Sequence, residues 1–172
     1  MLYTEWLGDV VTSTEVAIAT TTLGSANATI SFTSIPSTYT DLRIVFTGTV
    51  TAASSLRLTF NSDSGTNYSF RIIRGNGTEA ASRQTQDASF MTFHNQNLST
   101  TIPQFYSFDI FSYAGSTNKT LLATTQQDLN GDGSVLYTVA LWRNTAAIST
   151  VTFTNSVSTF AAGTTATLYG IL

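Results

Sequence analysis

The sequence predicts an all-β protein: an antiparallel two-sheet β-sandwich, jelly-roll-like, with a short N-terminal arm. Three observations support this prediction. Apolar and polar residues alternate in many short segments, clusters of Gly, Asn, Ser and Asp separate these segments, and no segment longer than two turns has a helical period. The chain also holds 33 threonines, a β-branched residue that fits a half-exposed sheet surface. Short strands without intervening helices are typical of a sandwich or a barrel.

Ten or eleven segments have the character of strands. The alternation is clearest where Leu, Ile, Phe or Tyr occupies every second position, in residues 41–47, 55–60, 67–73 and 104–111. The other candidates are residues 16–22, 28–34, 89–93, 119–125, 135–142, 149–154 and 165–171. A period of two residues indicates that each strand buries one face.

The domain organisation follows from the length and from the first fifteen residues. A chain of 172 residues is expected to form one domain. We assign residues 16–172 to a single β-sandwich domain and residues 1–15, which are apolar and aromatic without clear alternation, to an arm. An exposed cluster of Tyr3, Trp6 and Leu7 outside the domain would be an apolar patch unless it docks somewhere. These three residues are therefore the predicted interface with a neighbouring chain.

The stretch DLNGDG (128–133) resembles the first half of a calcium-binding EF-hand loop. Such a loop needs a carboxylate at its twelfth position and a helix on each side, but position twelve is Val139 and both flanks have strand character. Asn-Gly and Asp-Gly are typical of tight hairpin turns. We therefore predict a strand connection and no metal site. Asp63, Ser64 and Gly65 predict a second turn of this kind.

Composition excludes several other classes of site and partner. The net charge is −3 and the seven basic residues are scattered, so no nucleic-acid partner is expected. No apolar run is long enough to span a membrane, and the N-terminus lacks the basic residues of a secretory signal. The absence of cysteine excludes disulfides and thiolate ligands, and it suits folding in a reducing cytoplasm. Gly75 and Gly77 lack the remainder of a dinucleotide-binding motif, so no cofactor is expected.

The sequence offers no recognisable set of catalytic residues, and we predict that the protein is not an enzyme. His94, the single histidine, follows a strand and has no G-x-S-x-G motif to accompany it. Asp109 lies within a predicted strand and is expected to face outward, but no second carboxylate is singled out to act with it. Trp142 is expected in the core or on a sheet face.

The surface is expected to be poor in charge, because charged residues make up 10% of the chain against about 25% in an average soluble domain. One interpretation is an ordinary β-domain with a threonine-rich exterior. The other, which we favour, is that neighbouring subunits cover much of the surface, since weak charge repulsion allows a protein to pack against its own copies.

Five motifs in order resemble small structural proteins of tailed bacteriophages, including phages of cyanobacteria. They are FTSIPSTYTDLRIVFTGT (32–49), LRLTFNSDSGTNYSF (56–70), GNGT (75–78), LWRNTAAISTVTFTNS (141–156) and FAAGTTATLYGIL (160–172). The resemblance extends over roughly residues 28–172. Ser62 departs from the pattern, because Gly often stands there in the family.

The resemblance implies a non-enzymatic virion component with a β-sandwich fold. For a short chain with an arm and little surface charge, it suggests a capsid decoration (cement) protein. Such a protein would form a homotrimer, bind the major capsid protein on the capsid surface of the virion, and be assembled in the host cytoplasm. The alternative is a tail or fibre component that binds host glycans, with Trp6, Trp142 and the tyrosines as a stacking platform. A carbohydrate-active enzyme is a third interpretation, which lacks a carboxylate pair.

Overall fold

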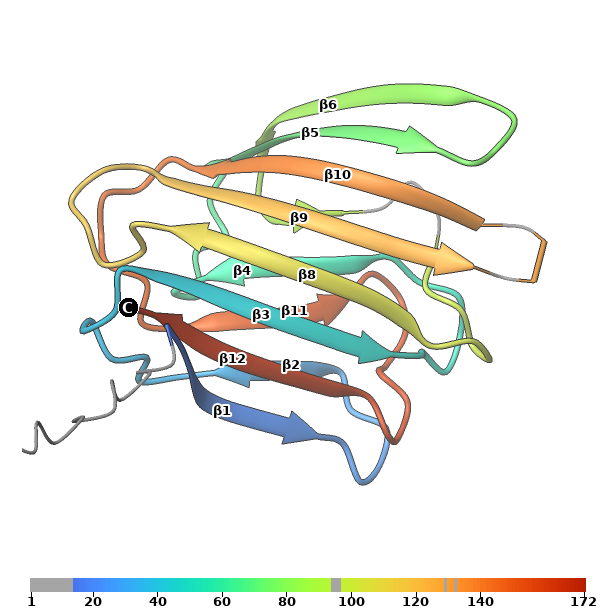
Figure 1. Cartoon of the computed structure of the whole chain (residues 1–172), viewed down its shortest axis with the longest axis horizontal. Helices are drawn as coiled ribbons and strands as arrows, with labels where there is room; N and C mark the ends of the chain where they lie inside the picture. The colour runs from blue at the N-terminus through green and yellow to red at the C-terminus, as the bar shows by residue number, and fades with distance from the viewer. Residues whose placement is uncertain (1–13, 94–96, 129, 132) are drawn as a thin grey trace, which may run out of the picture.

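A computed structural model describes residues 14–93, 97–128, 130–131 and 133–172, and every regular element in these ranges is a β-strand (Figure 1). The twelve strands are β1 (Glu15–Thr22), β2 (Thr29–Phe32), β3 (Asp41–Gly48), β4 (Leu56–Phe60), β5 (Tyr68–Gly75), β6 (Ala80–Ala88), β7 (Met91–Thr92), β8 (Gln104–Phe111), β9 (Lys119–Asp128), β10 (Gly133–Trp142), β11 (Val151–Asn155) and β12 (Thr165–Ile171).

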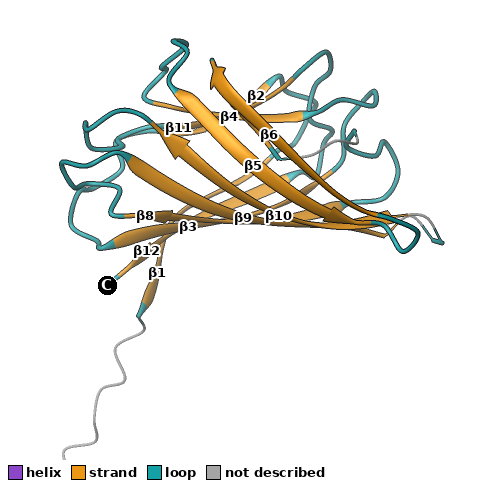
Figure 2. Ribbon diagram, turned by 90° about the horizontal axis from the view of Figure 1, so that it is seen from above, coloured by secondary structure: helices purple, strands orange, loops and turns teal. Residues whose placement is uncertain are grey.

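The strands form two antiparallel sheets that pack face to face, which confirms the predicted sandwich (Figure 2). The large sheet has eight strands in the order β1-β12-β3-β8-β9-β10-β5-β6. The small sheet has four strands in the order β2-β11-β4-β7. At one end of the large sheet, β5 and β6 curl toward the small sheet (Figure 2).

Eight of the strands have the connectivity of a jelly roll. These strands receive the letters B to I in chain order when we count β1, β2, β3, β4, β7, β8, β11 and β12. The part β1-β12-β3-β8 of the large sheet then has the order B-I-D-G, and the small sheet has the order C-H-E-F, as in a jelly roll. The other four strands are two inserted hairpins, β5–β6 between β4 and β7 and β9–β10 between β8 and β11. Both hairpins continue the large sheet beyond β8, and this is why the two sheets differ in width.

The core lies between the inner faces of the two sheets and is rich in aromatic rings. Phe46 of β3 and Phe108 of β8 contact Phe153 of the small sheet, with ring centroids 5.6 and 5.3 Å apart. At the other end, Phe60 of β4 lies 5.5 Å from the ring of Trp142. Trp142 is wholly buried, as expected for a core residue. Rings at these distances add to the stabilisation that burial of their area provides.

Each of the eleven predicted segments overlaps a strand of the structure, but β6 was not predicted. Its sequence, AASRQTQDA, has no apolar alternation, and all nine positions are exposed or half-buried. It pairs with β5 through the backbone ladder and through a side-chain hydrogen bond between Arg71 and Gln84. A strand that buries neither face carries no periodic signal, because the period of two reflects burial.

The stretch DLNGDG connects β9 to β10, as predicted. Asn130 and Gly131 have φ angles of 61° and 108°, which are values that Asn and Gly tolerate in tight turns. The backbone N–H of Asn130 donates a hydrogen bond to Oδ1 of Asp128 at 2.9 Å. This carboxylate therefore holds a turn, and Asp132 lies outside the described residues.

Candidate functional site

The outer face of the large sheet carries a group of exposed apolar side chains, because no element of the described structure covers it. Val135, Tyr137 and Val139 alternate along β10 with 51%, 57% and 46% of their surface exposed. Ile73, which is 65% exposed, pairs with Tyr137 across the β5–β10 ladder. On the other side of β10, Phe105 of β8 is 38% exposed and is separated from Val135 by Gln126 of β9. We call Ile73, Phe105, Val135, Tyr137 and Val139 the outer patch.

The local sequence explains why β10 has two apolar faces. In GSVLYTVALW the inward residues Leu136, Ala140 and Trp142 belong to the core and Thr138 is also buried, while Val135, Tyr137, Val139 and Leu141 point outward. A continuous apolar run is normally expected for a strand covered on both sides. The sequence predicted the strand β10 but not the outer patch. The nearly continuous apolar run VLYTVALW was the feature that could have indicated an apolar outer face.

The grouping of these side chains distinguishes the outer patch from ordinary surface hydrophobicity. Single exposed apolar residues are common on soluble proteins and have no special meaning. Ile73, Val135, Tyr137 and Val139 lie close together on two adjacent strands, and such a group on one face is typical of a contact surface. Burial of a fully exposed side chain of this size contributes about 1.5–3 kcal/mol, so covering even half of the patch would stabilise a complex appreciably.

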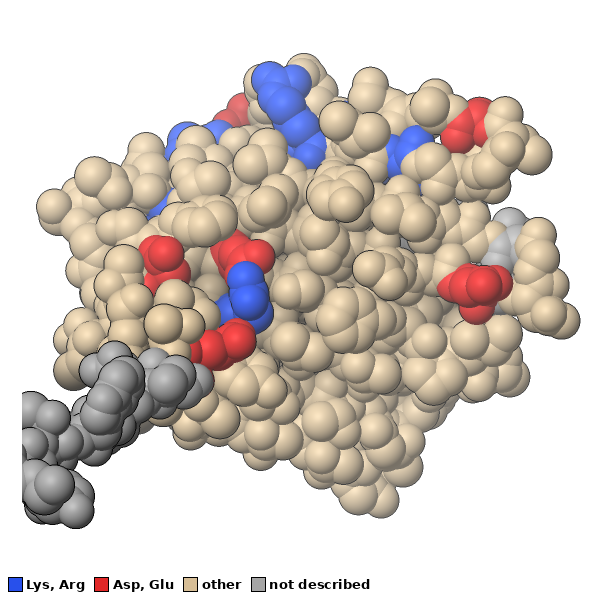
Figure 3. Space-filling view, in the orientation of Figure 1, with Lys and Arg blue, Asp and Glu red and all other residues tan. Residues whose placement is uncertain are grey.

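The same sheet face has little charge, and its charged side chains gather in one group and along the rim (Figure 3). The group contains Arg43 of β3, whose Nε lies 2.6 Å from Oδ1 of Asp109 and whose Nη1 lies 3.6 Å from Oε1 of Glu15. The hydrogen bond to Asp109 raises the pKa of Arg43, although partial burial opposes the rise. Asp109 faces outward as predicted, and its carboxylate accepts the hydrogen bond from Arg43 on the neighbouring strand.

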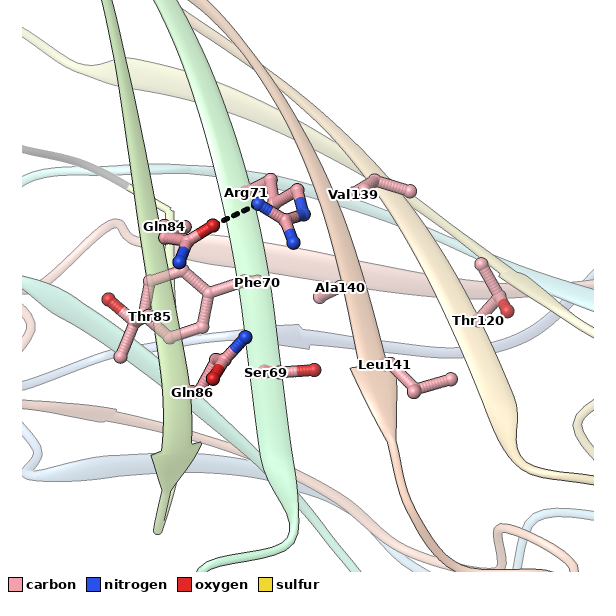
Figure 4. A pocket seen from close by; sticks show the side chains of 10 residues that line it. All are labelled: Ser69, Phe70, Arg71, Gln84, Thr85, Gln86, Thr120, Val139, Ala140 and Leu141. Atoms are coloured by element: carbon pink, nitrogen blue, oxygen red, sulfur yellow. Dashed lines mark hydrogen bonds between the residues drawn. The ribbon is translucent and has the colours of Figure 1, made fainter.

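A pocket of about 270 Å³ lies beside the outer patch, where β5, β6 and β10 meet (Figure 4). Val139 and Leu141 supply its apolar side, and Arg71 supplies its cation. The guanidinium of Arg71 donates a hydrogen bond to Oε1 of Gln84 on the neighbouring strand. The outward side chains Ser69, Gln86 and Thr120 complete the polar lining. This arrangement suits an apolar or aromatic side chain with an acidic or π-electron group near Arg71.

One buried and one half-buried ionisable group, Lys119 and Asp63, have structural partners. The wholly buried Lys119 donates through Nζ to the carbonyl oxygens of Gly115 at 2.6 Å, Thr117 and Thr145 at 3.3 Å, and burial lowers its pKa. Burial raises the pKa of Asp63, but hydrogen bonds outweigh this effect and the net pKa lies below its usual value. Both groups hold loops against the sandwich.

The predicted interface residues Tyr3, Trp6 and Leu7 lie outside the described residues, as does His94. Within the described ranges, no group of three or more His, Asp or Glu side chains is placed to hold a metal ion. The same ranges contain no helix that is both long and apolar enough to cross a membrane.

Comparisons with protein families, curated proteins and solved structures found no match to this chain. The interpretation of function therefore depends on the site itself. Its chemistry is that of a contact surface: exposed apolar side chains, an adjoining pocket with one cation, and a surrounding face with little charge.

Proposed function

We propose that this protein is a structural subunit of a larger protein assembly, and that the assembly is a bacteriophage virion in which it acts as a capsid decoration protein. The observation that carries the first part is the outer patch on a sheet face with little charge. The second part rests on the resemblance of five ordered sequence motifs to structural proteins of tailed phages.

The physical properties of the surface support such a role. A decoration protein must bind and need not react, so apolar contact area is the property that it requires. With 10% charged residues, the chain offers little repulsion to its own copies. Contacts that are weak singly become strong when a symmetric trimer engages several sites on a shell at once. The outer patch supplies such a contact without a ligand or cofactor.

The alternative, a tail or fibre component that binds host glycans, has less support from the structure. Trp142, one of the aromatic residues expected to stack on a sugar, is wholly buried and donates a hydrogen bond to Asp63. We therefore favour the decoration protein. Binding of the protein to a host polysaccharide on a glycan array would reverse this preference.

Light scattering coupled to size-exclusion chromatography tests the subunit role. The wild type is expected to be a trimer, and Tyr137→Lys in the outer patch is expected to shift it toward monomer. Thr29→Lys is the matched control, because Thr29 is exposed on a strand of the small sheet and gains the same charge. A wild-type protein that stays monomeric at all concentrations and binds no capsid would overturn the proposal.

The virion assignment has its own test. Mass spectrometry of purified particles of the phage that encodes the chain should detect it in stoichiometric amounts. Particles that lack it should release DNA at a lower temperature than wild-type particles, and adding purified protein should restore their resistance. If the chain is absent from purified particles, the decoration role is wrong.

A further inference from the structure

The pocket beside the outer patch has the size of a receptor for a side chain. Its volume is about 270 Å³, whereas small-molecule sites usually enclose about 300–1,000 Å³. It adjoins Val139, a member of the outer patch, so a polypeptide that fills the pocket can also cover apolar residues along β10.

The charge of the pocket favours an acidic segment. Arg71 is its cation, and no Asp or Glu lines it. At the β1 side of the same sheet face, a second hollow is lined by three carboxylates, from Glu15, Asp41 and Asp109, against the single guanidinium of Arg43. The sheet face is thus positive at the pocket and negative where β1 begins.

The chain itself contains a segment with the matching properties. Residues 1–13 precede the described structure and hold two carboxylates, Glu5 and Asp9, and no Lys or Arg. They also carry the aromatic and apolar residues Tyr3, Trp6 and Leu7. Thirteen residues span at most about 45 Å when extended, which is enough to reach across a neighbouring subunit.

We propose that residues 1–12 of one copy dock on a second copy, with an aromatic ring in the pocket near Arg71 and apolar residues on the outer patch. This inference rests on the proposed function, since it requires that copies of the chain associate. A ring over the guanidinium of Arg71 gains a cation–π attraction, and Glu5 and Asp9 gain from the same positive charge.

Charge distinguishes docking on a second copy from docking on the same domain. Five strand spacings, about 24 Å, separate β1 from β10, so length alone permits both. To reach the pocket of its own domain, the acidic segment would have to cross the three carboxylates beside the start of β1. Like charges at close range are unfavourable, whereas a segment that arrives from another copy need not pass them.

Photo-cross-linking of the full chain tests this arrangement. Tyr3→benzoylphenylalanine places an aromatic photoreactive group in the segment while keeping Trp6. We expect a cross-linked product between two chains, with the attachment mapped by mass spectrometry to the strands that line the pocket, β5, β6, β9 and β10. Cross-links within one chain, or to strands that contribute to neither the pocket nor the outer patch, would overturn the inference.

A charge exchange makes the test specific. Arg71→Glu is expected to reduce the cross-linked product at least threefold, and combining it with Glu5→Arg and Asp9→Arg should restore the product. Thr29→Lys is the control and should leave the yield unchanged. A yield that does not respond to Arg71→Glu would show that the segment binds elsewhere.

The outcomes separate this inference from the proposed function. If the protein is trimeric by light scattering but the segment cross-links within its own chain, the inference is wrong and the proposed function stands. If the protein is monomeric at all concentrations and binds no capsid, both are wrong.

Discussion

The indole Nε1 of Trp142 donates a hydrogen bond of 2.7 Å to Oδ2 of Asp63, which joins the end of β10 to the turn between β4 and β5. The same carboxylate accepts hydrogen bonds from the backbone N–H of Gly65 at 2.8 Å and from Nδ2 of Asn67 at 2.9 Å. The residues predicted as a simple turn therefore also anchor an inserted hairpin to the sandwich.

Replacing this carboxylate should destabilise the protein. Asp63→Ala leaves a buried indole N–H and two further donors without their acceptor, and we expect a loss of about 2–3 kcal/mol in the free energy of unfolding. Urea denaturation measures this loss. Ser64→Ala, at the exposed neighbouring position, should change stability by less than about 0.5 kcal/mol. An equal effect of the two substitutions would contradict this account.

The pKa of Asp63 predicts an acid dependence of stability. Because its folded pKa lies below the ordinary value of 3.8, the carboxylate stabilises the native state above that value, and the contribution disappears as pH falls through the folded pKa. The difference in unfolding free energy between wild type and Asp63→Asn should therefore be constant from pH 7 to about 5 and shrink below about 4. If the difference in unfolding free energy instead grew as the pH fell, the pKa of Asp63 would be raised in the folded state and this account would be wrong.

Lys119→Met should cost stability without disturbing the surface. The substitution keeps the length of the aliphatic side chain, but the carbonyl oxygens of Gly115, Thr117 and Thr145 lose their donor. Unsatisfied buried acceptors cost about 1–3 kcal/mol each, partly recovered by entering water, so we expect a total loss of about 2–4 kcal/mol. Thermal and urea unfolding both report it, and an unchanged midpoint would contradict the inferred role.

The buried tyrosines should resist alkaline titration. Burial raises the pKa of Tyr68 to about 12 and also raises the pKa values of Tyr106 and Tyr113. A raised folded pKa means that the stabilising contribution is complete below the unfolded value of about 10 and is lost as pH rises toward 12. Ultraviolet absorbance should show tyrosine ionisation in two phases, the second coinciding with loss of the native circular dichroism signal. A single phase complete before unfolding would contradict the burial of these hydroxyls.

Asp109→Asn tests both the ion pair and the interpretation as an enzyme. Asp109 and Arg43 are partly exposed, so the substitution should lower the unfolding free energy by no more than about 1 kcal/mol. If the protein is not an enzyme, assays for glycoside hydrolysis should detect no activity in the wild type and none in the variant. Hydrolysis by the wild type that the substitution removes would revive the catalytic alternative.

The fold was predictable from the sequence where burial of one strand face produces an alternation of apolar and polar residues. The segments 41–47 and 104–111 alternate because one face packs on the core, and they became β3 and β8. Residues 80–88 bury neither face, so β6 left no such trace. The unequal widths of the two sheets could not be predicted either, because no local sequence pattern indicates that both inserted hairpins join the same sheet.

The candidate site was only partly predictable. The sequence indicated a contact protein through its low charge, yet it directed attention to Tyr3, Trp6 and Leu7, which lie outside the described residues. The outer patch depends on which side of β10 is left uncovered, and this is a property of the assembled sheets. The virion origin and the trimer remain predictions.

Because β6 pairs on one side only and buries neither face, this edge of the large sheet is weakly held. Local opening requires the least free energy where few apolar contacts must be broken. Amide protons of β6 should consequently exchange with deuterated solvent long before those of β3, which has a partner on each side. Fraying of this border would expose β5 next, which is the strand that β6 pairs with.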